Sequence, residues 1–245
     1  MLKPVRRQSL SDAVFEQLRD RILVEELSAG MALPPERELA KQLGVNRQAV
    51  REALKRLEQM RLVTIQHGGG TTVVDYRAEG YLDLLPPLAG LGPRPDRIVL
   101  RSIAEMRGVV YPEVARSAAL RATGKVRASI ADCVEEMGES VDLFRLHEHV
   151  QRFWMILAEG SQNVAFRLTF NTLRMAQEPY LDSLMPSLEA ELTDRDSYFR
   201  IAQAVGTGDA ESAAKYAQIL VDKGERGLAE AVLQLDAVGA GSAHG

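Results

Sequence analysis

Apolar residues recur every three or four positions in the first sixty residues, which is the spacing of helices with one buried face. We expect a first helix to begin near Ser11, with an apolar stripe made of Val14, Phe15, Leu18 and Ile22. A second helix is predicted over residues 36–43, because Pro34 and Pro35 preset its first turn and Gly44 tolerates a left-handed ending. The tight connection at Gly44 leads directly into a third helix.

This third predicted helix spans residues 47–60, and Asn46 is placed to cap its first turn. Its inward face consists of Val50, Ala53, Leu57 and Met60. Arg47, Arg51 and Lys55 follow at intervals of four, so they line a separate stripe of the same helix. The helix therefore presents cations away from its buried side.

Two short β-strands are predicted over residues 62–66 and 71–74, because both segments are rich in Val, Ile and Thr. They flank His67 and a run of three glycines, which let the backbone approach a phosphodiester closely. A nucleotide-binding phosphate loop needs a helix directly after its glycines, whereas a strand follows here. Two helices, a tight turn and two strands in this order predict a winged helix-turn-helix, an architecture that enters a DNA groove.

The first turn of the third helix holds the residues that reach base edges in such motifs. Arginine can bond guanine N7 and O6 together and Gln48 can read adenine, whereas Lys55 and Arg56 suit the phosphate backbone. The alternative is an ordinary amphipathic helix with solvated charges. The complete order of helices, turn and wing favours DNA binding.

Residues 96–235 show helical periodicity and no convincing pair of strands. Glycines and prolines break this stretch near residues 124, 138, 160–162, 179, 186 and 206–208. Pro112 is expected to bend or interrupt the first of these helices. We therefore predict a mostly α protein, with an antiparallel bundle of about six or seven helices behind the winged domain at 1–76. A linker over 77–95 holds one short helix near 78–85, and the tail at 236–245 is expected to be disordered.

Composition and charge narrow the class of protein. Residues 1–75 hold 12 Lys and Arg against 10 Asp and Glu, whereas the remainder is acidic, so the DNA-facing surface belongs to the first half. Cys133 is the single cysteine, and no apolar run suits a secretion signal or a membrane span, which predicts a cytoplasmic protein. The sequence lacks a nucleophile, His and acid in any familiar order, so no enzyme is expected.

Three blocks of the first half stand in a specific order: Leu-Pro-Pro-Glu-Arg-Glu-Leu-Ala at 33–40, Leu-Gly-Val-Asn-Arg at 43–47 and Val-Arg-Glu-Ala-Leu at 50–54. This series resembles the GntR family of bacterial transcription regulators. The resemblance implies that Arg37, Arg47 and Arg51 contact the operator and that His67 enters the minor groove. The full set of candidate DNA-binding residues is Arg37, Asn46, Arg47, Gln48, Arg51, Lys55, His67 and Gly68. Asn46 and Gln48 stand where hydroxyl residues are frequent in the family, which leaves the operator sequence open.

A second, looser resemblance is carried by Glu105-Met106-Arg107, by Phe153 with Asn163 ten residues later, and by Ala204 ahead of Gly208-Asp209. Together with the wing sequence Ile-Gln-His-Gly at 65–68, these residues are similar to the FadR subfamily. Most relatives bind a metal in the bundle through one Asp and three His, and the metal holds a small carboxylate. The corresponding positions here carry Val150, Trp154, Tyr198 and Leu220. Val, Trp and Leu offer a metal no donor atom, so we expect the metal site to be missing and no cofactor to be bound.

The fatty-acid-responsive members of this subfamily also lack those ligands. The resemblance implies an effector site formed by Arg107, Tyr111, Trp154 and Tyr198, with acyl-CoA or a fatty acid as the preferred effector. Two alternatives stay open, a small organic acid sensed with or without a metal, and DNA binding without any effector. His147 and His149 are the rival metal ligands, but residues two apart on a helix point in different directions. A palindromic operator would be read by a homodimer, because its two-fold symmetry matches that of two recognition helices.

Overall fold

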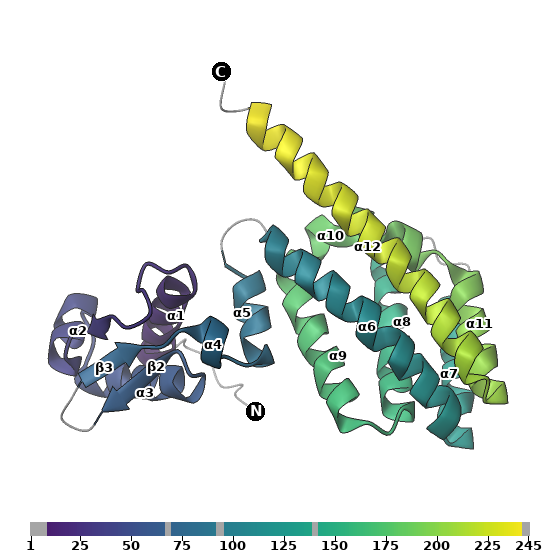
Figure 1. Cartoon of the computed structure of the whole chain (residues 1–245), viewed down its shortest axis with the longest axis horizontal. Helices are drawn as coiled ribbons and strands as arrows, with labels where there is room; N and C mark the ends of the chain where they lie inside the picture. Colours follow the sequence, from purple (N-terminus) through teal and green to yellow (C-terminus); the bar gives the residue numbers. More distant parts are fainter. Residues whose placement is uncertain (1–8, 67–69, 92–95, 139–141, 242–245) are drawn as a thin grey trace, which may run out of the picture. The chain divides into compact units, whose positions relative to one another are not determined.

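The structure is a computed structural model that describes residues 9–66, 70–91, 96–138 and 142–241, with 231–241 given as helical backbone. The chain divides into two compact units, Met1–Leu91 and Gly92–Gly245, whose elements are labelled in Figure 1. Among the described residues, no helix combines the length and the apolar composition that crossing a bilayer requires.

The first unit contains three principal helices, a small sheet and a short helical tail. Its elements are α1 (Leu10–Leu23), β1 (Ala32–Leu33), α2 (Glu36–Leu43), α3 (Arg47–Gln59), β2 (Val63–Gln66), β3 (Gly70–Val73), α4 (Tyr76–Glu79), η1 (Leu82–Leu84) and α5 (Leu85–Ala89). Helix α2 has the predicted bounds, and Gly44 ends it with a left-handed φ of 65°. Helix α1 begins earlier than predicted, because Ser9 and Asp12 form a capping box and Ser11 does not cap.

The sheet contains a strand that the sequence pattern missed. Strand β3 lies between β1 and β2 and runs antiparallel to both. Strand β1 is only Ala32 and Leu33, which is too short to show a two-residue period. It is held in the sheet by pairing with β3, a contact between segments almost forty residues apart. Strands β2 and β3 confirm the predicted wing.

The core of the first unit lies where α1, α3 and the sheet meet (Figure 1). Val50, Ala53 and Leu57 are fully buried, as the helical period predicted, while Met60 is half-buried. The predicted linker is more helical than expected, since α4, η1 and α5 follow one another before residue 91. Leu84 from η1 joins the buried core, so this segment belongs to the first unit.

The second unit is entirely helical in its described residues. Its elements are α6 (Arg97–Arg121), α7 (Gly124–Met137), α8 (Leu143–Gly160), α9 (Val164–Gln177), η2 (Glu178–Tyr180), α10 (Leu181–Leu192), α11 (Arg195–Thr207) and α12 (Ala210–Gly241). This agrees with the predicted bundle. Helices α6 and α12 are the longest elements and pack against each other along much of their length (Figure 1).

Most predicted breaks between these helices are confirmed, but two prolines do not end a helix. Pro112 lies inside α6 and Pro186 inside α10. Proline removes one backbone donor, and burial of the surrounding apolar face outweighs that loss in a long packed helix. Helix α12 also continues to Gly241, beyond residue 235 where we expected order to end.

Candidate nucleic-acid interface and effector site

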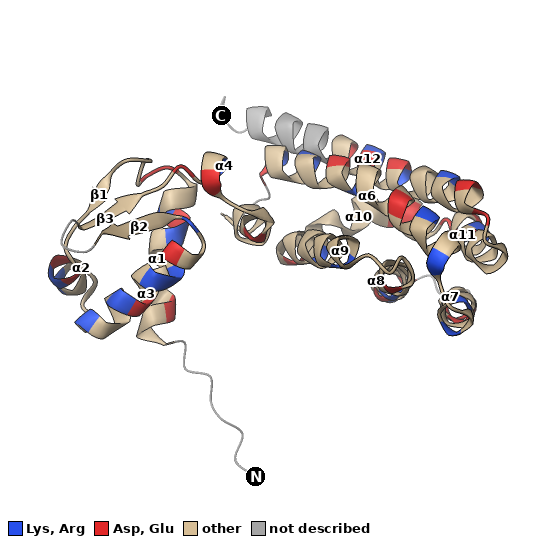
Figure 2. Cartoon of the chain, turned by 60° about the horizontal axis from the view of Figure 1, so that its bottom comes forward, with Lys and Arg blue, Asp and Glu red and all other residues tan. Residues whose placement is uncertain are grey.

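Helix α3 holds its cations on an exposed surface because its opposite side is anchored. The Asn46 side-chain oxygen accepts a hydrogen bond of 2.8 Å from the backbone N–H of Ala49, which fixes the start of the helix. With the apolar side buried, the remaining candidates on the helix are all exposed: Arg47, Gln48, Arg51 and Lys55. Lys and Arg residues gather along α1 and α3 in Figure 2. Arg37, on the first turn of α2, is exposed as well.

Arg51 is joined to the helix that precedes it in the motif. Its Nε donates to Glu36 Oε1 at 3.2 Å and its Nη2 donates to Glu36 Oε2 at 3.0 Å, which forms a two-pronged ion pair between α3 and α2. The hydrogen bonds from Arg51 lower the pKa of the Glu36 carboxyl. Glu36 therefore binds the guanidinium edge formed by Nε and Nη2. The Nη1 atom of Arg51 makes no bond to Glu36. Gln48 is also engaged, since its Nε2 donates to Glu52 Oε1 at 2.9 Å.

Arg56, expected at the phosphate backbone, also forms contacts within the first unit. Its Nη1 lies 2.5 Å from Asp12 Oδ1 on α1, and its guanidinium lies 4.0 Å from the centre of the Phe15 ring. The pKa of Asp12 is lowered first by hydrogen bonding to Ser9 and then by Arg56. Arg56 therefore joins α1 to α3, while its side chain stays 43% exposed.

The wing is held close to α3 by a side chain of that helix. Glu58 Oε1 accepts a hydrogen bond of 3.0 Å from the backbone N–H of Ile65 on β2. Gln66 pairs with Gly70 at the end of the β2–β3 ladder. His67 and Gly68, the two candidates in the wing sequence, lie outside the described residues.

The second unit brings together the four predicted effector residues, which come from three helices. Arg107 and Tyr111 lie on α6, Trp154 on α8 and Tyr198 on α11, and all four are buried. The rings of Tyr111 and Trp154 have centres 4.4 Å apart, and the Arg107 guanidinium lies 5.1 Å from the centre of the Tyr111 ring. Sequence periodicity could not show this convergence, because the residues are up to 91 positions apart.

A residue that the sequence did not single out completes the cluster. Glu191 on α10 accepts a hydrogen bond of 2.5 Å from Arg107 Nη2, and the two side chains are only 2% and 7% exposed. Burial raises the pKa of Glu191, while the charge of Arg107 opposes that shift. The sequence shows two glutamates in the amphipathic segment Leu181–Leu192, Glu189 and Glu191, and both are typical of surface charges. Only the fold shows that Glu191 lies opposite Arg107.

Arg107, Tyr111, Trp154 and Glu191 line a small, partly open cavity of about 10 Å³, whereas Tyr198 lies outside its lining. It is lined by Arg107, Tyr111, His147, Val150, Gln151, Trp154, Gln177, Leu188, Glu191 and Leu192. A cavity of that size holds about one water molecule.

Several buried polar atoms around the cavity have no hydrogen-bond partner among the described residues. They are Arg107 Nε, Gln151 Oε1, Trp154 Nε1, Glu191 Oε2 and Tyr198 OH. Buried polar groups in folded proteins nearly always have partners, and exceptions point to a water, an ion or a ligand. These atoms come from four helices and lie in one cluster, which makes the cluster the candidate effector site of the second unit.

The donor set around the cavity does not fit the metal that related proteins hold at these positions. Val150, Trp154 and Leu220 are buried and carry no metal-binding atom, and the carboxylate of Glu191 already pairs with a cation. His147 lines the cavity, where burial and then the charge of Arg107 lower its pKa. Within the described residues, no group of three or more His, Cys, Asp or Glu is arranged to hold a metal ion.

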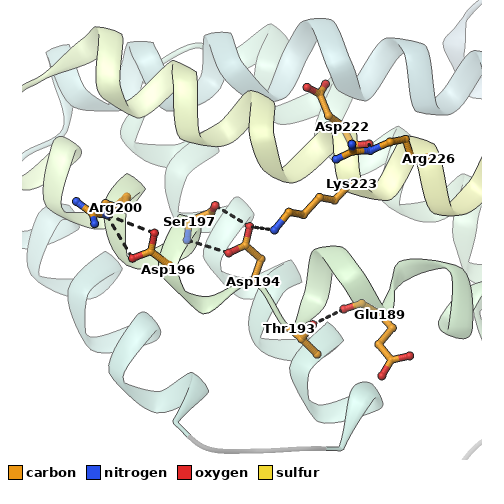
Figure 3. A network of polar contacts seen from close by, with 9 residues as sticks. All are labelled: Glu189, Thr193, Asp194, Asp196, Ser197, Arg200, Asp222, Lys223 and Arg226. Carbon is orange, nitrogen blue, oxygen red and sulfur yellow. Dashed lines mark hydrogen bonds and ion pairs between the residues drawn. The ribbon is translucent and has the colours of Figure 1, made fainter.

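Next to the cluster, a polar network fastens α11 to α12 (Figure 3). Asp194 caps α11 by accepting hydrogen bonds from the Ser197 N–H at 3.2 Å and from its hydroxyl at 2.7 Å. Lys223 Nζ of α12 lies 2.6 Å from the same Asp194 carboxylate. The network therefore fixes the helix that carries Tyr198.

Comparisons with known proteins match both units of the chain. The gntR family of bacterial regulatory proteins matches residues 10–73, and the FCD domain matches residues 102–222. The chain is 38% identical to the HTH-type transcriptional regulator Mce2R of Mycobacterium tuberculosis, over 90% of this chain and 92% of that protein. It is 32% identical to the putative L-lactate dehydrogenase operon regulatory protein of Escherichia coli, over 84% and 81% of the two chains. It is 28% identical to the fatty acid metabolism regulator protein of Edwardsiella ictaluri, over 69% and 70%.

These matches cover the winged unit and the helical unit in the same order, and they are to regulators rather than to enzymes. The exposed cations of α3 and the buried polar cluster of the second unit thus fall in the two domains that such regulators use. The chain belongs to the GntR family of bacterial transcription regulators, with a C-terminal FCD domain.

Proposed function

We propose that this regulator binds a palindromic operator as a homodimer and leaves it when a metabolite enters the Arg107 cluster, with a fatty acid or acyl-CoA as the first candidate. The observation that carries the effector site is the set of unpartnered buried polar atoms around one buried arginine. DNA binding takes place in the bacterial cytoplasm, where the operator lies.

The proposed DNA contacts follow from the exposed side of α3. Arg47 and Gln48 lie in its first turn, the part of a recognition helix that reaches base edges, and Arg51 lies one turn later. Lys55 and Arg37 are placed for phosphate contacts from α3 and α2. One such helix reads only a few base pairs, so operator specificity requires two copies on half-sites about one helical turn apart.

The effector proposal rests on the chemistry of the buried cluster. Arg107 offers a positive charge, while Tyr111, Trp154 and Tyr198 supply large apolar surfaces with polar ends. A fatty acid or acyl-CoA combines an acidic or polar head with an apolar chain, and one relative is named for fatty acid metabolism. The cavity has room for only about one water molecule in this structure, so binding of a larger effector requires the helices around it to move apart.

A small organic acid is the second candidate, because it needs less opening of a cavity of about 10 Å³. The relative named for an L-lactate dehydrogenase operon is matched over a larger share of both chains than the fatty acid regulator. Neither candidate involves a metal, because the buried donor set does not fit one.

The test is a thermal-shift screen of acyl-CoAs, fatty acids and small organic acids, read beside release of the operator in a gel-shift assay. A true effector stabilises the protein in proportion to its concentration over its Kd and releases the DNA in the same range. Tyr198→Phe removes only the unpartnered hydroxyl, so it should weaken the effector response and leave the DNA affinity of the free protein unchanged. A screen in which no compound stabilises the protein would establish an effector-independent DNA-binding protein instead.

A further inference from the structure

We propose that Glu191 occupies the place of the effector's acidic group on Arg107, and that the effector is a carboxylate that binds by displacing it. This inference rests on the effector site proposed above. It names the chemical class of the ligand and the residue that competes with it.

The contact between the two residues uses only part of their bonding capacity. Arg107 Nη2 donates to Glu191 Oε1, whereas Arg107 Nε and Glu191 Oε2 have no partner among the described residues. A buried guanidinium and carboxylate are most stable when both form two parallel hydrogen bonds. An ion pair kept for stability alone would be expected to satisfy these atoms, because each unpartnered buried group is costly. The pair therefore holds Arg107 without saturating it.

The size of the cavity shows whether a ligand carboxylate can bind beside Glu191 or must replace it. Its free volume of about 10 Å³ holds about one water and has no room for a carboxylate group beside Glu191. Two carboxylates on one buried arginine would also repel each other. A ligand carboxylate has the same shape and charge as the group already there, so it fits once Glu191 leaves.

A glycine of the neighbouring helix creates the place that Glu191 fills. A Cβ atom at Gly224 of α12 would overlap Glu191 Oε2 and approach Arg107 Nη1 to 3.4 Å. One turn further along α12, a Cβ at Gly227 would overlap the carbonyl oxygen of Ser187 on α10. The position of Glu191 thus depends on the close approach of α10 and α12. Its displacement links ligand binding to the packing of these helices.

The experiment compares carboxylate affinities of the wild type, Glu191→Gln and Gly224→Ala, followed by the fluorescence of Trp154, the single Trp of the chain. The probes are octanoate, octanoyl-CoA and L-lactate. Glu191→Gln removes the competing charge with little change of shape, whereas the Cβ of Gly224→Ala fills the place that Glu191 and a ligand carboxylate would share. We expect Glu191→Gln to bind the preferred acid at least 10-fold more tightly than the wild type does, about 1.4 kcal/mol. Gly224→Ala should bind it no more tightly than the wild type does. Arg107→Met should abolish the binding.

Glu189→Gln is the matched control, because Glu189 is an exposed glutamate on the same helix. Its affinity should equal that of the wild type. A merely structural role for the ion pair predicts unchanged or weaker binding in Glu191→Gln, and that result overturns the displacement while leaving the effector site in place. Binding of octanoyl-CoA alone, without octanoate or L-lactate, overturns the carboxylate class. If none of these proteins binds any probe, both this inference and the proposed effector chemistry are refuted.

Discussion

The buried Arg107–Glu191 pair predicts a strong energetic coupling that a double-mutant cycle can measure. Two opposite unit charges about 4 Å apart attract each other by about 4 kcal/mol at an effective dielectric constant near 20. With side chains 7% and 2% exposed, removing one partner leaves the other charge buried and unpaired. We therefore expect Arg107→Met and Glu191→Met to lower the free energy of unfolding by about 3–5 kcal/mol each.

The double variant should be more stable than either single variant, because two apolar side chains of similar length leave no unpaired charge. The coupling energy is then at least about 3 kcal/mol. Urea unfolding followed by Trp154 fluorescence is the suitable assay, since this buried residue reports on the second unit alone. If the losses in the two single variants simply add in the double variant, the pair carries no coupling and the reasoning from its burial is wrong.

Three further predictions test other parts of the molecule. Arg51→Ala should abolish specific retention of the operator in a gel-shift assay. The circular dichroism spectrum should stay unchanged, because this side chain is exposed. Normal retention of the operator would show that Arg51 is not part of the interface. Gly227→Ala should lower the free energy of urea unfolding by about 1–3 kcal/mol, because the added Cβ would overlap α10. Gly206→Ala should be neutral or slightly stabilising, because a Cβ at Gly206 meets open space. Equal effects of the two substitutions would contradict the close crossing of α10 and α12. Burial opposes ionisation of Asp194, but hydrogen bonds headed by the one from Lys223 outweigh it and lower the pKa of Asp194. The contribution of Asp194 to the free energy of unfolding is therefore full above the ordinary pKa of 3.8 and is lost as the pH falls below that value. Lys223→Met should reduce this acid-induced loss of stability in unfolding titrations. An unchanged pH profile would refute the role of the pair.

Local signals predicted the winged unit well. The bounds of α2, the left-handed Gly44 and the Asn46 cap of α3 depend on residues within one turn of each other, so the sequence could indicate them directly. The N-cap of α1 was misplaced by two residues, because Ser9 and Ser11 are both suitable and only Ser9 has Asp12 at the reciprocal position. Strand β1 has no period of its own, and its partner β3 decides that it is a strand.

In the second unit, too, the local features were predicted and those that depend on distant residues were not. Breaks at Gly138 and Gly208 were predicted from residue type, whereas Pro112 and Pro186 stay inside helices because packing outweighs their local cost. Arg107, Tyr111, Trp154 and Tyr198 were found through resemblance to a family. The partner of Arg107, which determines the charge of the site, was not found.

By itself, the sequence determined the helix-turn-helix, its exposed cations and the helical nature of the second half, because these features follow from spacing and capping along one segment. Only the tertiary structure decided that Glu191 faces Arg107, that Arg51 is paired with Glu36 and that the cavity has room for only about one water molecule. Those contacts join residues 84 and 15 positions apart along the chain. The strength of these contacts depends on burial and on the angle at which helices cross, and local periodicity predicts neither quantity.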